Sequence, residues 1–177
     1  RSPDEVMLRD AASHFARESG AAGAPDRDLV MAQHLEWWAA RLPTDAKIVV
    51  WTATVHAARA PGANPVLGVP PIGARVAGRW GDRLAAIGFT ALRGEWSRAG
   101  EPIKQLGPLP PQALEVRALA AAGDGAGWAY LDRTALRAIG PVPSRLFGPV
   151  TTADWSAAFD GVVVIRDEGP PTFEQRR

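Results

Sequence analysis

The hydrophobic positions near the N-terminus recur at helical spacing in two segments. Segment 2–20 begins with Ser-Pro-Asp-Glu and stops at Gly20, and segment 27–42 follows Asp26 and ends at Pro43. Ser and Asp side chains cap the free N–H groups of a first turn, and Pro cannot continue a helix. The pattern therefore predicts two helices. The apolar face of the second repeats every three or four residues and consists of Leu29, Val30, Ala32, Leu35, Trp38 and Leu42.

Four compact apolar runs then follow, at 46–51 (AKIVVW), 84–92 (LAAIGFTAL), 127–132 (GWAYLD) and 159–169 (FDGVVVIRDEG). Short continuous runs are typical of buried strands, which is the prediction for 46–51, 84–92 and 159–169, whereas 127–132 predicts a short strand. Segment 73–83 between the first two runs predicts a short helix. The order strand, helix, strand predicts a parallel βαβ unit with a right-handed crossover.

The remaining pattern completes an α/β protein with a mainly parallel sheet and flanking helices. Helices are predicted over 112–123 and 133–140, and the proline-rich segment 93–112 predicts an irregular loop, long enough to cover a cleft. Four strands make an incomplete layer, and two helices precede the first strand. We therefore expect residues 1–177 to form one portion of a single α/β domain, in which 1–25 supply an N-terminal helix and connector.

The composition of the chain restricts its possible binding partners more than it restricts the reaction it could catalyse. The chain is 46% hydrophobic and 22% charged, and 20 Lys and Arg residues against 19 Asp and Glu residues leave a net charge of +1, so we expect neither nucleic acid nor membrane as a partner. The absence of cysteine excludes disulfides and thiolate sites. No signal-peptide pattern follows Arg1, but an export signal could have been removed, so the compartment stays open, with the cytoplasm as the default expectation.

One histidine follows the first predicted strand closely. Ligands of open α/β sheets bind beyond the carboxyl ends of the strands, and His56 lies five residues after Trp51 in this position. A histidine there can act as a general base, orient a partner or ligate a metal. The alternative is a histidine that hydrogen-bonds the loop backbone. His14 and His34 lie far away on predicted helices, the three form no metal-binding spacing, and we expect no metal and no cofactor.

Several motifs, in this order, resemble the erythromycin esterase family. "PDRDLVMAQHLEWW" resembles its Arg–Asp helix, "KIVVWTATVHAAR" its strand ending W-A-H-N-x-H, and "PIGARVAGRWGDRLAAIGFTALRGEW" its M-G helix and A-I-G-F strand. "FDGVVVIRDEGPPT" resembles its last strand, so the similarity covers 26–172 and leaves 173–177 as a tail. The matching positions are Arg27, Asp28, Met31, Ala32, Trp37, Trp51, His56 and Gly73.

The resemblance implies a bacterial hydrolase in which His and Glu activate water against a carboxylic ester, such as a macrolactone, without a metal. It makes His56 the candidate catalytic residue, and Trp51 and Thr54 the candidate substrate-binding residues. Ala53 stands in place of the first histidine of the strand-end motif, and the Glu and His motifs of the family's N-terminal half have no counterpart. The chain is therefore expected to be the C-terminal part of the domain, inactive without the N-terminal half.

Two other hypotheses remain beside the hydrolase. Gln33, His34 and Ala53 depart from the family motifs, which favours a divergent, non-catalytic small-molecule binding protein. Haem is one candidate small molecule, with His56 as an axial ligand of its iron. The third is a half-domain that folds only against its N-terminal half or a second copy, because strands buried on both faces need helices on both sides. The expected partners are thus an ester substrate and either the N-terminal half or a dimer partner.

Overall fold

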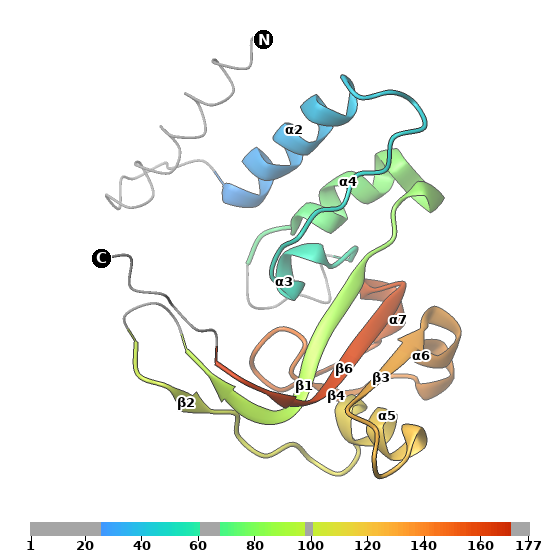
Figure 1. The fold of residues 1–177 in the computed structure, drawn as a ribbon. Coiled ribbons are helices and arrows are strands. Elements are labelled where there is room, and N and C mark those ends of the chain that lie inside the picture. The colour runs from blue at the N-terminus through green and yellow to red at the C-terminus, as the bar shows by residue number, and fades with distance from the viewer. Residues whose placement is uncertain (1–25, 61–67, 98–100, 171–177) are drawn as a thin grey trace. The chain divides into compact units, whose positions relative to one another are not determined.

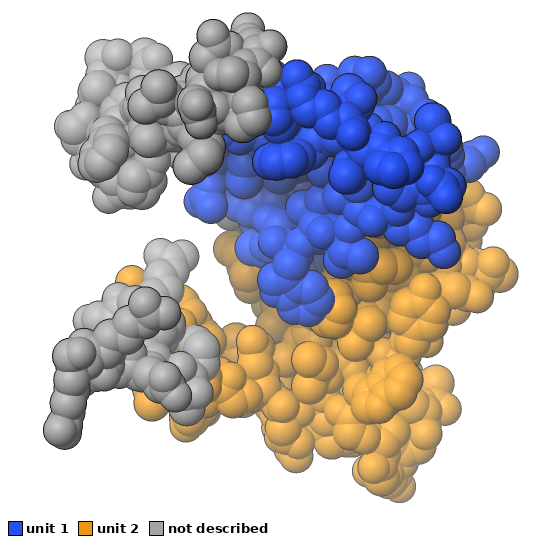
Figure 2. Space-filling view, turned by 45° about the horizontal axis from the view of Figure 1, so that its top comes forward, with its two compact units in different colours: residues 1–84 blue, residues 85–177 orange. Residues whose placement is uncertain are grey.

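The computed structural model describes residues 26–60, 68–97 and 101–170. The chain divides into two compact units, Arg1–Leu84 and Ala85–Arg177, which Figure 2 shows in blue and orange. The helix predicted over 2–20 and the tail at 173–177 lie outside the described residues. The assignment of 1–177 to a single domain portion stays a prediction.

The first unit is helical in its described part. It contains α2 (Arg27–Ala39), α3 (Thr54–Ala57) and α4 (Ile72–Trp80), and α4 continues into the 3₁₀ turn η2 (Gly81–Arg83) (Figure 1). The Asp26 side chain accepts hydrogen bonds from the first-turn N–H groups of α2, as the capping pattern predicts. Both predicted helices, 27–42 and 73–83, are therefore confirmed, the first of them ending three residues earlier. Their shared core consists of Ala32, Ile72 and Val76, with Met31, Leu35, Trp80 and Leu84 packed around it.

The predicted apolar face of α2 is only partly buried. Val30 and Ala32 are buried, whereas Leu29, Trp38 and Leu42 are exposed. Among the described helices, α2 packs mainly against α4. A helix that packs against a single neighbour buries a narrow stripe, and the rest of its apolar face stays in contact with solvent.

The prediction of a strand over 46–51 is wrong. Residues 46–53 form neither helix nor strand, and the side chains of Val49 and Trp51 are 87% and 84% exposed. A strand requires a neighbouring strand to pair its N–H and C=O groups, and none of the strands in the described part of the chain pairs with this segment. The parallel βαβ unit predicted from 46–51 to 84–92 is therefore also absent from the described residues.

The second unit contains a four-stranded mixed sheet. Its order is β2 (Lys104–Gln105), β1 (Ile87–Trp96), β6 (Gly161–Glu168) and β3 (Trp128–Asp132). β1 and β6 are parallel, with Ile87 opposite Gly161, whereas β2 and β3 pair antiparallel to their neighbours. The α/β class is confirmed, and so are the strands predicted over 84–92, 127–132 and 159–169. The sheet of the described residues is mixed rather than mainly parallel as predicted, because β2 and β3 join β1 and β6 in the antiparallel direction. Segment 93–112 is less irregular than predicted, because it contains the end of β1 and all of β2.

Helices and a hairpin complete this unit. They are α5 (Leu114–Ala122), α6 (Arg133–Ile139), α7 (Trp155–Ala158), and the pair β4 (Val142–Ser144) and β5 (Thr151–Ala153) (Figure 1). α5 and α6 confirm the helices predicted over 112–123 and 133–140. The pattern does not predict α3, α7, β4 or β5, since elements of three or four residues carry too little periodicity. Within the described part of this unit, the largest fully buried hydrophobic side chains are Leu114, Leu119, Leu136, Trp155, Phe159, Val162 and Val164.

Candidate functional site

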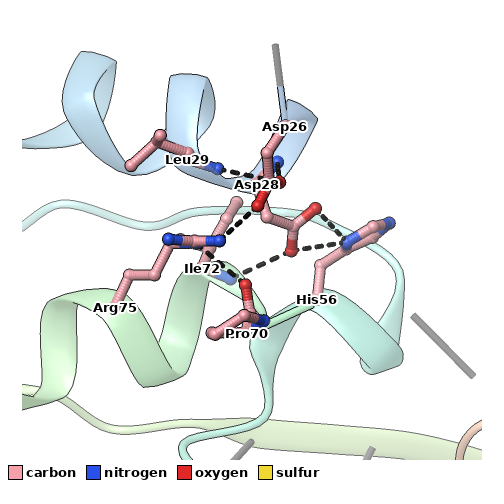
Figure 3. A network of polar contacts seen from close by, with 7 residues as sticks. All are labelled: Asp26, Asp28, Leu29, His56, Pro70, Ile72 and Arg75. Carbon is pink, nitrogen blue, oxygen red and sulfur yellow. Dashed lines mark hydrogen bonds and ion pairs between the residues drawn. The ribbon is translucent and has the colours of Figure 1, made fainter. Parts of the chain in front are cut away.

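His56 is held by a buried carboxylate. It lies on α3, and its ring Nδ1 is 2.9 Å from each carboxylate oxygen of Asp28 on α2 (Figure 3). Asp28 is buried, whereas the His56 side chain keeps 14% of its surface exposed. The arrangement joins a titratable ring to a fixed acceptor while part of the ring still reaches solvent.

The same carboxylate also binds the beginning of α4. The backbone N–H of Ile72, the first residue of α4, donates to Asp28 Oδ2 at 3.0 Å. The first N–H groups of a helix have no partner within it, and a negative charge there is favoured by the helix dipole. The two donors compensate for the burial of the carboxylate, since a buried charge without partners is costly. Asp28 thus connects α2, α3 and α4.

A second aspartate, one residue before α2, makes a parallel connection. Oδ1 of Asp26 caps α2, and its Oδ2 accepts a hydrogen bond from the guanidinium of Arg75 on α4. Arg75 Nε donates to the carbonyl oxygen of Pro70 at 2.9 Å (Figure 3). The starts of α2 and α4 are therefore held together by two carboxylates, and only that of Asp28 contacts His56.

The backbone that carries His56 lies directly against α4. A Cβ atom at Gly73 would be 2.1 Å from the carbonyl oxygen of Ala57 and 2.6 Å from that of Ala58. No side chain fits at such distances, so the glycine permits the approach of the two elements. This position is the helix-opening glycine of the sequence motif.

The other sequence-predicted site residues lie near His56 along the chain. Thr54 is the half-buried first residue of α3, and Trp51 lies exposed in the irregular segment before it. Ala53 occupies the N-cap position of α3 and provides no side-chain hydrogen bond there. His34 is half-buried on α2. The roles of His56, Trp51 and Thr54 in catalysis and substrate binding stay predictions.

Asp28 is the site residue that sequence reasoning did not single out. It matched a motif position, but an acidic residue in the first turn of a helix is usually a solvated partner of the helix dipole. Its contact with His56 spans 28 residues of sequence. A contact of this range leaves no local pattern, and the motif match was the single available signal.

A metal site and a membrane-spanning helix each require particular features of the described residues. Among residues 26–60, 68–97 and 101–170, no three or more His, Cys, Asp or Glu side chains are arranged so that they could hold a metal ion. None of the helices in these ranges is long and apolar enough to cross a bilayer. The expectation of no metal and no cofactor stays a prediction.

The second unit has its own buried polar cluster. Glu115 on α5 is fully buried, and its Oε1 accepts from Thr90 Oγ1 at 2.7 Å, Ser144 Oγ at 2.7 Å and the backbone N–H of Arg145 at 3.0 Å. Burial lowers the pKa of the Arg145 guanidinium, and the charge of Glu115 opposes that effect. The cluster links β1, α5 and β4, which indicates a structural role.

Comparison with solved structures identifies the fold of this chain. The mixed sheet with its flanking helices is similar to three solved structures, which establishes the fold. One is a Bacillus cereus protein, with 20% identity, a TM-score of 0.63, and coverage of 84% of this chain and 39% of that one. Another is a histidine-to-asparagine mutant of erythromycin esterase EreC in its open conformation, with 20% identity, a TM-score of 0.61, and coverage of 80% and 36%. The third, a succinoglycan biosynthesis protein, has 14% identity, a TM-score of 0.60, and coverage of 93% and 48%.

The family follows from the sequence profile. The erythromycin esterase profile matches residues 6–168, so the chain belongs to the erythromycin esterase family. No curated protein matches the sequence. The chain spans less than half the length of the three similar structures.

Proposed function

We propose that this chain is the C-terminal part of an erythromycin-esterase-like hydrolase, and that His56 is its general base toward a carboxylic ester, with a macrolactone as the candidate substrate. The observation that carries the proposal is the His56–Asp28 pair, in which a partly exposed imidazole is hydrogen-bonded to a buried carboxylate. A paired, partly exposed histidine is the usual general base near neutral pH.

The proposed reaction needs one water and one ester. His56 takes a proton from the water as its oxygen attacks the carbonyl carbon, and the tetrahedral intermediate then expels the alkoxide. The alkoxide receives that proton from the imidazolium, which gives the carboxylic acid and the alcohol. The charge of Asp28, 2.9 Å from Nδ1, stabilises the imidazolium between the two steps. Trp51 and Thr54 are proposed to contact the substrate.

The partner proposed for this site is the N-terminal half of the same domain. The apolar side chains of Ile48, Val49, Val50 and Trp51 are exposed in a segment that is neither helix nor strand, as expected for a strand whose neighbour is supplied from elsewhere. The chain covers 36% to 48% of the similar structures. The Glu and His groups of the family's other half would then complete the site opposite His56.

The test is hydrolysis by the protein expressed from the complete reading frame that contains this chain. A panel of simple esters and a macrolactone is assayed by mass spectrometry for the addition of water, with His56→Ala as the variant and His34→Ala as the matched control. His56→Ala is expected to lose about 10²–10⁴ in rate, as for other general bases. Equal rates for wild type and His56→Ala would remove His56 from the mechanism.

The second candidate is the non-catalytic binding protein, and the observation that favours it is Ala53. This residue, at the place of a motif histidine, caps α3 without any side-chain hydrogen bond. A folded protein that hydrolyses no ester of the panel but shifts the Soret band of added haemin would favour this candidate. Hydrolysis without a Soret shift would exclude its haem form.

A further inference from the structure

We infer that Asp28 is a positioning residue that fixes His56 in the tautomer with its proton on Nδ1, so that Nε2 carries the lone pair. The tautomer follows from hydrogen-bond accounting. An ionised carboxylate is an acceptor only, and both oxygens of Asp28 lie 2.9 Å from Nδ1. Nδ1 must therefore be the donor, and in a neutral imidazole the other nitrogen is then the acceptor.

The position of the carboxylate is itself fixed. Asp28 is buried on α2, and the Ile72 backbone N–H binds its Oδ2 at 3.0 Å. A backbone donor at a helix start cannot rotate away as a side-chain hydroxyl can. The packing of α2 against α4 therefore sets the plane of the Asp28 carboxylate. That plane in turn sets the orientation of the His56 ring, which donates to it. This gives the histidine one orientation and one tautomer before any substrate binds.

The consequence for rate, unlike the tautomer, rests on the proposed function. If His56 is the base, then Nε2 is the nitrogen that takes the proton from water. In serine proteases, replacing the orienting Asp by Asn keeps the geometry but reverses the tautomer, and kcat falls about 10⁴-fold. A similar loss is expected here, and in kcat rather than in KM, since Asp28 is buried away from solvent.

The informative variant is Asp28→Asn, because it preserves shape. The amide oxygen at the Oδ2 position can still accept from the Ile72 N–H, which places the amide NH₂ at the Oδ1 position, 2.9 Å from Nδ1. A proton on Nδ1 would then face the amide hydrogens, whereas a bare Nδ1 can accept a hydrogen bond from them. The ring then carries its proton on Nε2, and the lone pair needed for proton abstraction is lost. Asp26→Asn is the matched control: Asn also caps helices well, and Asp26 contacts Arg75 rather than His56.

The experiment reads the tautomer directly, by long-range ¹H–¹⁵N correlation spectra of the ¹⁵N-histidine-labelled protein at a pH where the ring is neutral. His56→Gln assigns the signals. Wild type and Asp26→Asn should show a protonated Nδ1, and Asp28→Asn a protonated Nε2. A protonated Nε2 in the wild type, or the same tautomer in Asp28→Asn as in the wild type, overturns the inference.

These outcomes separate the inference from the proposed function. The wild-type spectrum tests the tautomer even if Asp28→Asn fails to fold. A protonated Nδ1 in a protein that hydrolyses no ester supports the positioning role and rejects the esterase. Hydrolysis that is lost in His56→Ala but unchanged in a folded Asp28→Asn keeps the esterase and rejects Asp28 as a positioning residue for it.

Discussion

Replacing Glu115 with alanine should destabilise the chain strongly. Glu115 is fully buried, and one of its oxygens accepts hydrogen bonds from Thr90, Ser144 and the backbone of Arg145. Each buried donor left without a partner costs about 1–3 kcal/mol. The hydroxyls of Thr90 and Ser144 can rotate toward other acceptors, so their cost should lie at the lower end of this range. The backbone N–H of Arg145 cannot rotate.

The charge of Arg145 adds to this loss. Arg145 is buried, which lowers the pKa of its guanidinium, and the charge of Glu115 offsets part of that effect. Loss of the Glu115 charge removes an interaction that favours the charged guanidinium, so it acts in the same direction as the lost hydrogen bonds. With the two hydroxyls at the lower end of the range and the Arg145 N–H anywhere within it, we expect Glu115→Ala to lower the free energy of unfolding by about 3–5 kcal/mol in total.

Urea unfolding of the whole chain, followed by tryptophan fluorescence, measures this loss. Trp155 is buried in the same unit and reports its unfolding. Glu115→Gln keeps an acceptor for the three donors and should lose less than Glu115→Ala. The control is Glu101→Ala, which removes an exposed ion pair with Lys104 and should cost no more than about 1 kcal/mol. A loss below about 1 kcal/mol for Glu115→Ala would refute the accounting of buried donors.

Two further predictions concern a glycine and a surface pair. Gly73→Ala should lower the free energy of unfolding by about 1–3 kcal/mol, because its Cβ would overlap the carbonyl oxygen of Ala57. Gly78→Ala on the same helix has open space around its Cβ and should raise the free energy of unfolding by about 0.5–1 kcal/mol. Thermal unfolding measures both variants, and equal effects would contradict the close approach at Gly73. The hydrogen bond from Arg93 holds the pKa of Asp167 below its ordinary 3.8. The contribution of ionised Asp167 to the stability of the fold is therefore present above about pH 4 and is lost as the pH falls through the lowered pKa. The difference in unfolding midpoint between wild type and Asp167→Asn should therefore shrink on acidification, and a difference that is constant from pH 7 to the acid limit would exclude this cause.

The elements that the sequence predicted correctly have strong local signals. Asp26 before an apolar periodic segment marks the start of α2, and β-branched residues from Val162 to Ile165 mark β6. Such signals depend on neighbours within a few residues, which is why α4, α5, α6 and three of the predicted strands appear where expected. The family resemblance, which rests on the order of these motifs, was confirmed for the same reason.

The site depended on contacts that local signals do not encode. His56 was a candidate from its position, but the prediction placed it after a strand that the described structure lacks. The segment from Lys47 to Trp51 has the composition of a buried strand, yet pairing requires a partner strand, and composition cannot supply one. The donors that surround Glu115 were missed as well, because Thr90 and Ser144 come from different strands.

The sequence by itself determined the helices and strands with strong periodicity, the α/β class and the family. The tertiary structure alone decided which strands pair, that the sheet is mixed, and that Asp28 meets both His56 and the start of α4. The physical reason is range. Capping, periodicity and propensity act over one or two turns of chain, whereas a hydrogen bond between residues 28 or 44 positions apart forms only after whole elements have packed.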